Sequence, residues 1–288
     1  MWSAAQDKCP SGLGRLVAML LPDPADDELQ VMSFNLRYAD ANRPNSWAER
    51  RPAVRQLLQR ERPHLIGTQE GLDQQLRDIE ADQGGHYRNI GLGREGGRRG
   101  EFMMVLYDWR RLDPIEHGHY WLSDSPDIVG SMTWDGGWPR MVTWIRFADR
   151  RTEAQFYAVN THLEVGSAET REKSARLLRD RLRIFDTALP VLVFGDFNEP
   201  PAHPVHDLLV GDGPLVDSWD TAGRQGEGWG TFTDYRPPTL GGERIDWILT
   251  SPDVVTVATA VNTYRWRGQY PSDHLPVQAL LRLPAPAR

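Results

Sequence analysis

The sequence predicts an α/β protein built on a mixed β-sheet, and three observations support this. Ten short apolar segments have the composition of strands, whereas only two stretches have the longer apolar period of a helix. One strand–helix–strand unit lies near the N-terminus, and several later strands follow one another closely enough to pair as hairpins. Many strands with few helices favour a mixed sheet over a purely doubly wound one.

The strand–helix–strand unit begins at residue 29. Residues 29–36 are mostly apolar on both alternating faces, which is typical of a buried strand. Pro52 suits the first turn of a helix that stops before Pro63, and residues 64–68 form the next strand. The apolar stripe of this helix consists of Val54, Leu57 and Leu58.

The rest of the chain continues this pattern within a single domain. A second helix is expected over residues 168–187, with its inner face formed by Ala175, Leu178, Leu182 and Phe185. The remaining strands are expected at residues 102–107, 119–122, 142–147, 155–161, 190–194, 244–250, 254–261 and 276–283. We expect residues 1–28 to be an irregular lead-in, because prolines interrupt them, and residues 29–288 to form one domain.

Composition excludes several classes of protein. The single cysteine, Cys9, rules out an internal disulfide framework and an all-cysteine zinc site. The net charge of −7 argues against a surface that attracts nucleic acid everywhere, although a local basic cleft is still allowed. The apolar stretch of residues 16–21 is too short to span a bilayer. We therefore expect a cytoplasmic protein without a membrane span or obligate protein partner, with secretion as the alternative.

Polar residues stand where five of the apolar strand segments end. They are Asn35, Glu70, His162, the pair Asp196 and Asn198, and the pair Asp273 and His274. Polar groups delivered by several strand ends are how an α/β scaffold builds one active site. Carboxylates, amides and imidazoles in such a set indicate metal-assisted attack of water on a phosphate ester.

Asp246 differs from these residues because it lies inside an apolar strand segment. An unpaired carboxylate there costs several kcal/mol, roughly 3–5 when a buried charge loses its partner. His274 is the natural partner, since an aspartate that accepts from one ring nitrogen aims the other nitrogen at substrate.

Two further segments have competing interpretations. Residues 91–96 match the glycine spacing of a dinucleotide-binding turn, but a strand follows where a helix is required, so we interpret them as a solvated hairpin loop. The alternative is a loop that arches over substrate with Arg94, Arg98 and Arg99. Trp138 follows two glycines and is either a core residue or a ring at a cleft rim that stacks on substrate.

The ordered set of polar residues resembles the endonuclease/exonuclease/phosphatase superfamily. The resemblance extends over residues 31–283 and includes Phe34 to Tyr38, Trp121 to Ser123, and Pro139 with Arg140, which look like a bacterial branch. It implies a four-layered α/β/β/α sandwich in which two packed mixed sheets are flanked by helices. It also implies a Mg²⁺ or Mn²⁺ site at one edge of the sheets.

The same resemblance implies roles for individual residues. The metal would be held by Glu70, helped by Asn35 and Asp273, because oxygen ligands suit a hard cation. Asp196 would orient or deprotonate the attacking water, and Asn198 would hold that water or a phosphate oxygen. His162 and His274 would donate to the phosphate, with Asp246 behind His274. An ionised Asp196 and a neutral His274 are both competent bases, so the general base stays open.

Three residues are candidates for substrate binding: Glu101, Trp138 and Arg140. Arg140 either clamps a phosphate or forms a surface ion pair. Glu164 stands where deadenylase-like relatives carry a basic residue, and its charge should repel a polyanion. The resulting expectation is a Mg²⁺-dependent phosphoesterase for a small or lipid-type phosphate ester. The alternatives are a DNA or RNA nuclease and a non-catalytic binding protein that retains the fold.

Overall fold

Two six-stranded mixed sheets form the centre of the structure, a computed structural model that describes residues 20–285. The first sheet has the order β11-β12-β1-β2-β4-β3 and the second has the order β5-β6-β7-β8-β10-β9. The first comprises β1 (Glu28–Asn35), β2 (Leu65–Gly71), β3 (Tyr87–Ile90), β4 (Phe102–Asp108), β11 (Val255–Val261) and β12 (Val277–Arg282). The second comprises β5 (Leu112–Trp121), β6 (Met141–Asp149), β7 (Gln155–His162), β8 (Val191–Asp196), β9 (Val216–Asp217) and β10 (Asp246–Thr250).

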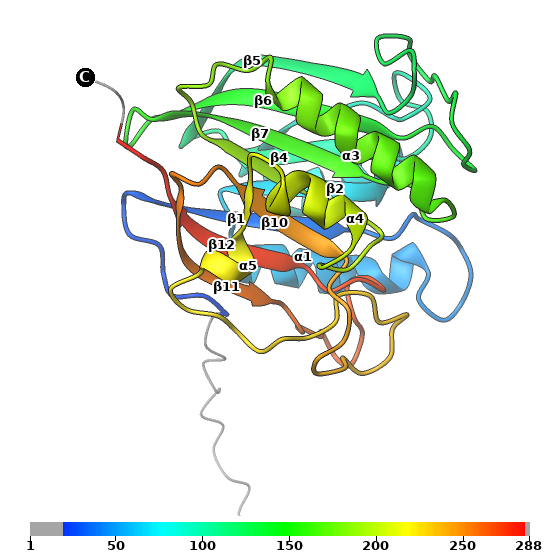
Figure 1. The fold of residues 1–288 in the computed structure, drawn as a ribbon. Helices are drawn as coiled ribbons and strands as arrows, with labels where there is room; N and C mark the ends of the chain where they lie inside the picture. The colour runs from blue at the N-terminus through cyan, green and yellow to red at the C-terminus, as the bar shows by residue number, and fades with distance from the viewer. Residues whose placement is uncertain (1–19, 286–288) are drawn as a thin grey trace, which may run out of the picture.

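Helices cover the outer faces of both sheets. The helical segments are α1 (Trp47–Glu61), α2 (Asp73–Asp82), α3 (Ala168–Leu182), α4 (Pro204–His206), the π-helical turn η1 (Asp207–Gly211) and α5 (Ser218–Thr221). Apolar side chains of α1 and α2 pack with those of β1, β2 and β4, whereas α3 packs on β7 and β8. In Figure 1, α3 lies across the front of the second sheet and α1 lies beyond the first. The predicted four-layered α/β/β/α sandwich is confirmed.

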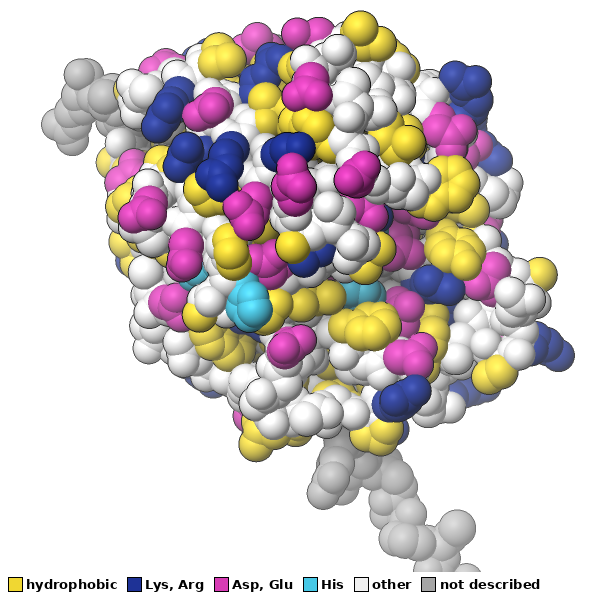
Figure 2. All heavy atoms as spheres, turned by 45° about the vertical axis from the view of Figure 1, so that its right-hand side comes forward, with side chains coloured by type: hydrophobic (Ala, Val, Ile, Leu, Met, Phe, Trp, Pro, Cys, Tyr) yellow, Lys and Arg dark blue, Asp and Glu magenta, His cyan; other side chains and the backbone are white. Residues whose placement is uncertain are grey.

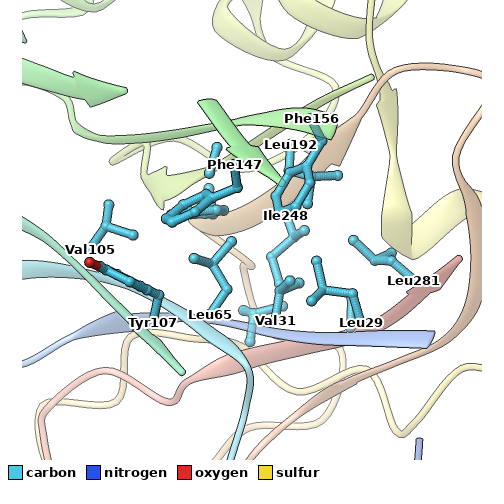
Figure 3. Packing of buried hydrophobic residues seen from close by; sticks show 14 of the residues in the cluster. Leu29, Val31, Leu65, Val105, Tyr107, Phe147, Phe156, Leu192, Ile248 and Leu281 are labelled. Carbon is cyan, nitrogen blue, oxygen red and sulfur yellow. The ribbon is translucent and has the colours of Figure 1, made fainter. Parts of the chain in front are cut away.

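The core between the sheets is made by alternate residues of facing strands. Leu29, Val31 and Leu65 of the first sheet meet Phe156 and Leu192 of the second, and all five side chains are fully buried. Figure 3 shows these side chains interdigitating between the two ribbons. The other alternate residues of β1, such as Met32 and Phe34, pack under the helices instead. Burial on both faces explains why β1 carries apolar residues on both of its alternating faces.

Helix boundaries differ from the sequence prediction at two places. Helix α1 begins at Trp47 because Ser46 and Glu49 form a capping box, so Pro52 lies inside the helix on its exposed side. Helix α3 ends at Leu182, and Phe185 beyond it still packs on the sheet by stacking on Tyr157 at 4.2 Å.

The strand directions bring the polar residues to one edge. Strand β1 is parallel to β2, and β7 is parallel to β8, so all four end at the same side. Strands β12 and β10 run antiparallel to β1 and β8 and therefore begin at that side. Residues 35, 70, 162, 196, 246 and 274 consequently converge.

The lead-in predicted for residues 1–28 falls mostly outside the described residues, and it stays a prediction, as does the single domain 29–288. Across residues 20–285, no helix combines the length and the apolar character that crossing a bilayer requires.

Candidate active site

All eleven predicted site residues meet at one cavity of about 570 Å³. Nine of them line it: Glu70, Glu101, Trp138, Arg140, His162, Asp196, Asn198, Asp273 and His274. Asn35 and Asp246 lie directly behind the wall, in contact with Glu70, Asp196 and His274. Figure 2 shows this face, where a partly covered histidine side chain lies among hydrophobic, acidic and basic groups.

Asp196 is the centre of the site. Its Oδ2 accepts a hydrogen bond from Asn35 Nδ2 at 2.9 Å and lies 3.5 Å from His162 Nε2 and 3.7 Å from His274 Nε2. Its Oδ1 accepts from the backbone N–H of Asn198 at 2.9 Å. Burial and the neighbouring charge of Asp246 raise the pKa of Asp196, although His274 and Asn35 oppose this. The carboxylate is therefore held in place while its proton affinity is increased.

Glu70 presents a half-buried carboxylate to the cavity. It ends β2 with a positive φ of 61°, which turns its side chain toward the cavity. Asn35 Nδ2 donates to its Oε1 at 2.9 Å, and the backbone N–H of Tyr38 donates to its Oε2 at 3.1 Å. Ligand atoms of Glu70, His162 and Asp196 lie within 4.8 Å of one another and can hold a metal ion.

Two predicted metal ligands take other positions. The Oδ1 of Asn35 accepts from the backbone N–H of Arg37 at 2.8 Å, so in this orientation Asn35 bridges Glu70 and Asp196. Asp273 also lines the cavity, where its Oδ1 accepts from Ser272 Oγ and its Oδ2 lies 3.7 Å from Arg37 Nε. Burial raises the pKa of Asp273.

The predicted pairing of Asp246 with His274 is present in the structure. His274 Nδ1 lies 2.9 Å from Asp246 Oδ2, so the ring points Nε2 toward Asp196 and the cavity. Burial favours the neutral ring, but the charges of Asp246 and Asp196 outweigh it and raise the pKa of His274 to about 10. His274 is therefore a protonated donor near neutral pH.

The pKa of His162 is shifted in the opposite direction to that of His274. Its side chain is 5% exposed, and burial together with Arg140 lowers its pKa well below the ordinary value, so the ring is neutral. Its Nδ1 is buried with no hydrogen-bond partner among the described residues. The ring can thus donate or accept a single hydrogen bond toward the cavity.

Arg140 is a buried residue of the cavity wall and does not form a surface ion pair. It is 9% exposed, and its Nε donates to Glu164 Oε2 at 3.1 Å. Glu164 is itself 3% exposed and also accepts from the backbone N–H of Gly166. Glu164 was expected to repel a polyanion as an unpaired charge. That expectation is wrong, because Arg140 balances the charge of Glu164.

The family scan decides the classification. The sequence model of the protein family described as the Endonuclease/Exonuclease/phosphatase family matches residues 32–274 of the chain. The chain belongs to the endonuclease/exonuclease/phosphatase family. Members of this family hydrolyse phosphoester bonds, and the chain is accordingly assigned as a phosphoester hydrolase.

Solved structures of the endonuclease/exonuclease/phosphatase fold resemble the chain along its length. A mannosyl-6-phosphatase from Bacteroides thetaiotaomicron is 32% identical with a TM-score of 0.84, over 88% of this chain and 99% of that one. A family protein from Bacteroides vulgatus is 30% identical with a TM-score of 0.84, over 89% and 99%. TDP2 from D. rerio, solved with a single-strand DNA product, is 16% identical with a TM-score of 0.68, over 88% and 98%, and shares the fold. The search of curated proteins gave no match.

Arg50 is a residue of this endonuclease/exonuclease/phosphatase domain that the sequence analysis missed. It is fully buried in α1 and donates to the backbone carbonyls of Leu36 at 2.7 Å and Pro271 at 3.0 Å, as well as to those of Arg37, Tyr38 and Asn45. It thereby joins the loop after β1, which follows Asn35, to the segment that carries Asp273. An arginine inside a helix gives no sequence signal for this function.

A buried amide pair holds the two sheets together under the site. Gln69 Nε2 donates to Asn160 Oδ1 at 2.8 Å, and Asn160 Nδ2 donates to the carbonyl of Thr68 at 2.9 Å. Beside this pair, a Cβ on Gly67 would lie 2.0 Å from the ring of Phe194, so glycine is required for the close approach. The residues beneath the active site are therefore tightly packed between the two sheets.

Proposed function

We propose that this protein is a Mg²⁺- or Mn²⁺-dependent phosphoesterase that hydrolyses a small-molecule phosphate ester by in-line attack of water. The observation that carries the proposal is the charge of the cavity wall, in which six carboxylates outnumber three arginines and the protonated His274. The carboxylates are Glu70, Glu101, Asp196, Asp234, Glu243 and Asp273, and the arginines are Arg37, Arg94 and Arg140. Such a wall repels a phosphate unless a divalent cation balances it.

The side chains present fit a hard divalent cation. Glu70 would be its main ligand, with an oxygen of Asp196 nearby and Asp273 in the same cavity. When bound, the cation supplies positive charge to the phosphate oxygens as the transition state forms. Asn35 keeps the carboxylates of Glu70 and Asp196 in a fixed separation by donating to both.

The remaining residues move protons and stabilise charge. The oxygen of a water forms the new bond to phosphorus while the opposite P–O bond of the ester breaks. Asp196 accepts the proton of that water, because protonated His274 cannot act as the base. His274 and Arg140 donate to the nonbridging oxygens, and Asn198 orients the water or an oxygen.

A screen of phosphate esters tests the proposal. Wild-type protein is assayed for phosphate release with Mg²⁺, Mn²⁺ or EDTA on sugar phosphates, nucleotides, glycerophosphodiesters and phospholipid head groups. Single- and double-stranded DNA and RNA are assayed in parallel by gel. We expect cation-dependent hydrolysis of small esters that Asp196→Ala abolishes and that Asp253→Ala, at an exposed aspartate, leaves intact.

The alternative is a nuclease of the same family. Faster cleavage of DNA or RNA than of any small ester would establish it and contradict the small-ester proposal. The cavity wall argues against it, because Glu101, Asp234 and Glu243 add three carboxylates to those of Glu70, Asp196 and Asp273, and this negative charge disfavours a polyanion.

A further inference from the structure

Arg94, Glu101 and Trp138 form a shelf on one wall of the cavity, which we call the Arg94 shelf. Arg94 and Glu101 make a bidentate ion pair, with distances of 2.8 Å from Nη1 to Oε2 and 3.0 Å from Nη2 to Oε1. The guanidinium lies 5.1 Å from the ring centroid of Trp138. Arg94 is 6% exposed whereas Trp138 is 56% exposed, so a buried ion pair supports an open aromatic ring.

The backbone fixes the shelf before any ligand arrives. The N–H of Arg94 donates to the carbonyl of Glu101 at 2.9 Å, and Trp121 Nε1 donates to the carbonyl of Arg94 at 2.6 Å. Gly100, with φ +73°, makes the turn that brings Glu101 back to Arg94. The interpretation of this segment as a solvated loop is therefore wrong at Arg94, which is buried and paired.

The shelf lies next to the proposed phosphate position. Arg140 and Glu70 are close enough to act electrostatically on both Arg94 and Glu101. A phosphate held by Arg140 and the cation thus places the rest of the substrate over Trp138 and beside Glu101. The shelf therefore contacts the group that is attached to the phosphate.

The chemistry of the shelf selects one class of group. Each oxygen of Glu101 keeps a lone pair after bonding Arg94, and an ionised carboxylate is a strong acceptor for hydroxyl donors. Asp234 and Glu243 add further acceptors to the cavity wall and disfavour an anionic neighbour. The exposed ring of Trp138 offers an apolar face to the C–H side of a saturated ring. These three properties favour a neutral saturated ring that carries several hydroxyl groups. A sugar has such a ring.

We propose that the Arg94 shelf binds the hydroxyl-bearing ring of a sugar phosphate and makes the enzyme selective for sugar phosphates. This rests on the proposed function, because the phosphate position orients the ring. Arg94 holds Glu101 and supports Trp138, and so is a positioning residue. Glu101 and Trp138 contact the sugar.

The kinetic test compares two esters that differ in the ring. Mannose 6-phosphate and ethyl phosphate share a primary phosphate ester, and only the first has a ring with hydroxyls. We expect the ratio of kcat/KM for mannose 6-phosphate over ethyl phosphate to fall at least tenfold in Glu101→Gln and in Trp138→Ala. Trp109→Ala, at an exposed tryptophan outside the cavity, serves as the matched control and should keep the wild-type ratio. An unchanged ratio in both shelf variants would overturn the proposal.

A binding test separates failure of the shelf from failure of catalysis. Saturation-transfer NMR with free mannose needs neither phosphate nor metal, so it reports on the shelf even if no ester is hydrolysed. We expect a signal with wild type and Trp109→Ala that is lost in Trp138→Ala, whose exposed side chain is not needed for folding. Equal signals in all three proteins, or none in wild type, would contradict the shelf as a sugar subsite.

Discussion

Two buried charged clusters lie at opposite edges of the same pair of sheets, and they are built differently. The Arg111 cluster consists of Arg111, Asp149 and His64, beside the start of β1 and β2 and the end of β6. The Asp196 cluster consists of Asp196, His162, His274 and Asp246, at the edge where β7 and β8 end. Both are nearly inaccessible to solvent.

The two clusters differ in whether their buried polar atoms have hydrogen-bond partners. Arg111 donates to Asp149 Oδ2 at 2.8 Å and to the carbonyl of Glu28 at 2.7 Å, and His64 Nδ1 accepts from the backbone N–H of Gln30. In the Asp196 cluster, His162 Nδ1 and Asp246 Oδ1 are buried without a hydrogen-bond partner among the described residues. A satisfied cluster stabilises the fold, whereas unpaired polar atoms and excess negative charge are typical of a functional site.

Neutralising the central carboxylate of each cluster should have opposite effects, and this is the largest difference expected. Asp196→Asn should lower kcat by about 10³-fold, within the usual range for a lost acid–base group, with an unchanged or raised Tm. Steady-state kinetics and calorimetry on one preparation measure both. Wild-type turnover in Asp196→Asn would remove the residue from the mechanism.

Asp149→Asn should show the reverse behaviour. It leaves the buried Arg111 with an uncompensated charge, which costs about 3–5 kcal/mol of unfolding free energy, while activity below the transition should persist. Urea unfolding gives the free energy. A loss of activity without a loss of stability would break the comparison between the clusters.

Glu70→Gln tests the cation site. A neutral amide weakens binding of a hard cation, so the Mg²⁺ concentration for half-maximal activity should rise about tenfold, as expected for roughly 1.4 kcal/mol. Glu116→Gln, at an exposed glutamate outside the cavity, is the control. An unaltered Mg²⁺ titration in Glu70→Gln would exclude Glu70 as a ligand.

Asp246→Asn should move the pH profile rather than abolish activity. The charge of Asp246 raises the pKa of both His274 and Asp196. Activity needs protonated His274 and ionised Asp196, so removing that charge should shift both the alkaline and the acidic limb to lower pH. A profile of kcat between pH 5 and 10 measures this. Unmoved limbs would show that Asp246 does not tune the pair.

His64 should affect stability in mild acid alone. Burial and Arg111 lower its pKa from 6.5 to about 3, so below pH 6.5 the unfolded state binds a proton that the native state does not. The contribution of His64 to the free energy of unfolding is fully present above pH 6.5. It falls as the pH is lowered, by about 2 kcal/mol at pH 5. His64→Gln should reduce the loss between pH 7.5 and 5 in urea unfolding. An equal loss in both proteins would show that His64 is not the cause.

Strand positions and strand-end chemistry were predictable because they are local signals. Asn35 and Asp196 each close an apolar run, and the pairing of Asp246 with His274 followed from the cost of a lone buried carboxylate. Helix α2 was not predicted, because Leu76 and Ile79 are its only buried apolar residues and give too short a stripe.

Partnerships between distant residues were not predictable. The pairing of Arg140 with Glu164 and the contacts of Arg50 with both site loops depend on tertiary packing, and each arginine looks like any other in the sequence. Arg94, Glu101 and Trp138 were each named as possible substrate contacts, but the ion pair and the ring contact that join them depend on packing and were not predicted. Local pattern therefore located the catalytic edge, whereas packing decides which charges are free to act.

Binding of inorganic phosphate with and without a divalent cation tests most directly whether the acid-rich cavity needs that cation. Calorimetric titration of wild-type protein should show phosphate binding in Mg²⁺ or Mn²⁺ and none in EDTA, and Glu70→Gln should bind weakly even with the cation. Equal phosphate affinity in EDTA and in Mg²⁺ would show that the arginines alone hold the substrate, and would contradict the account.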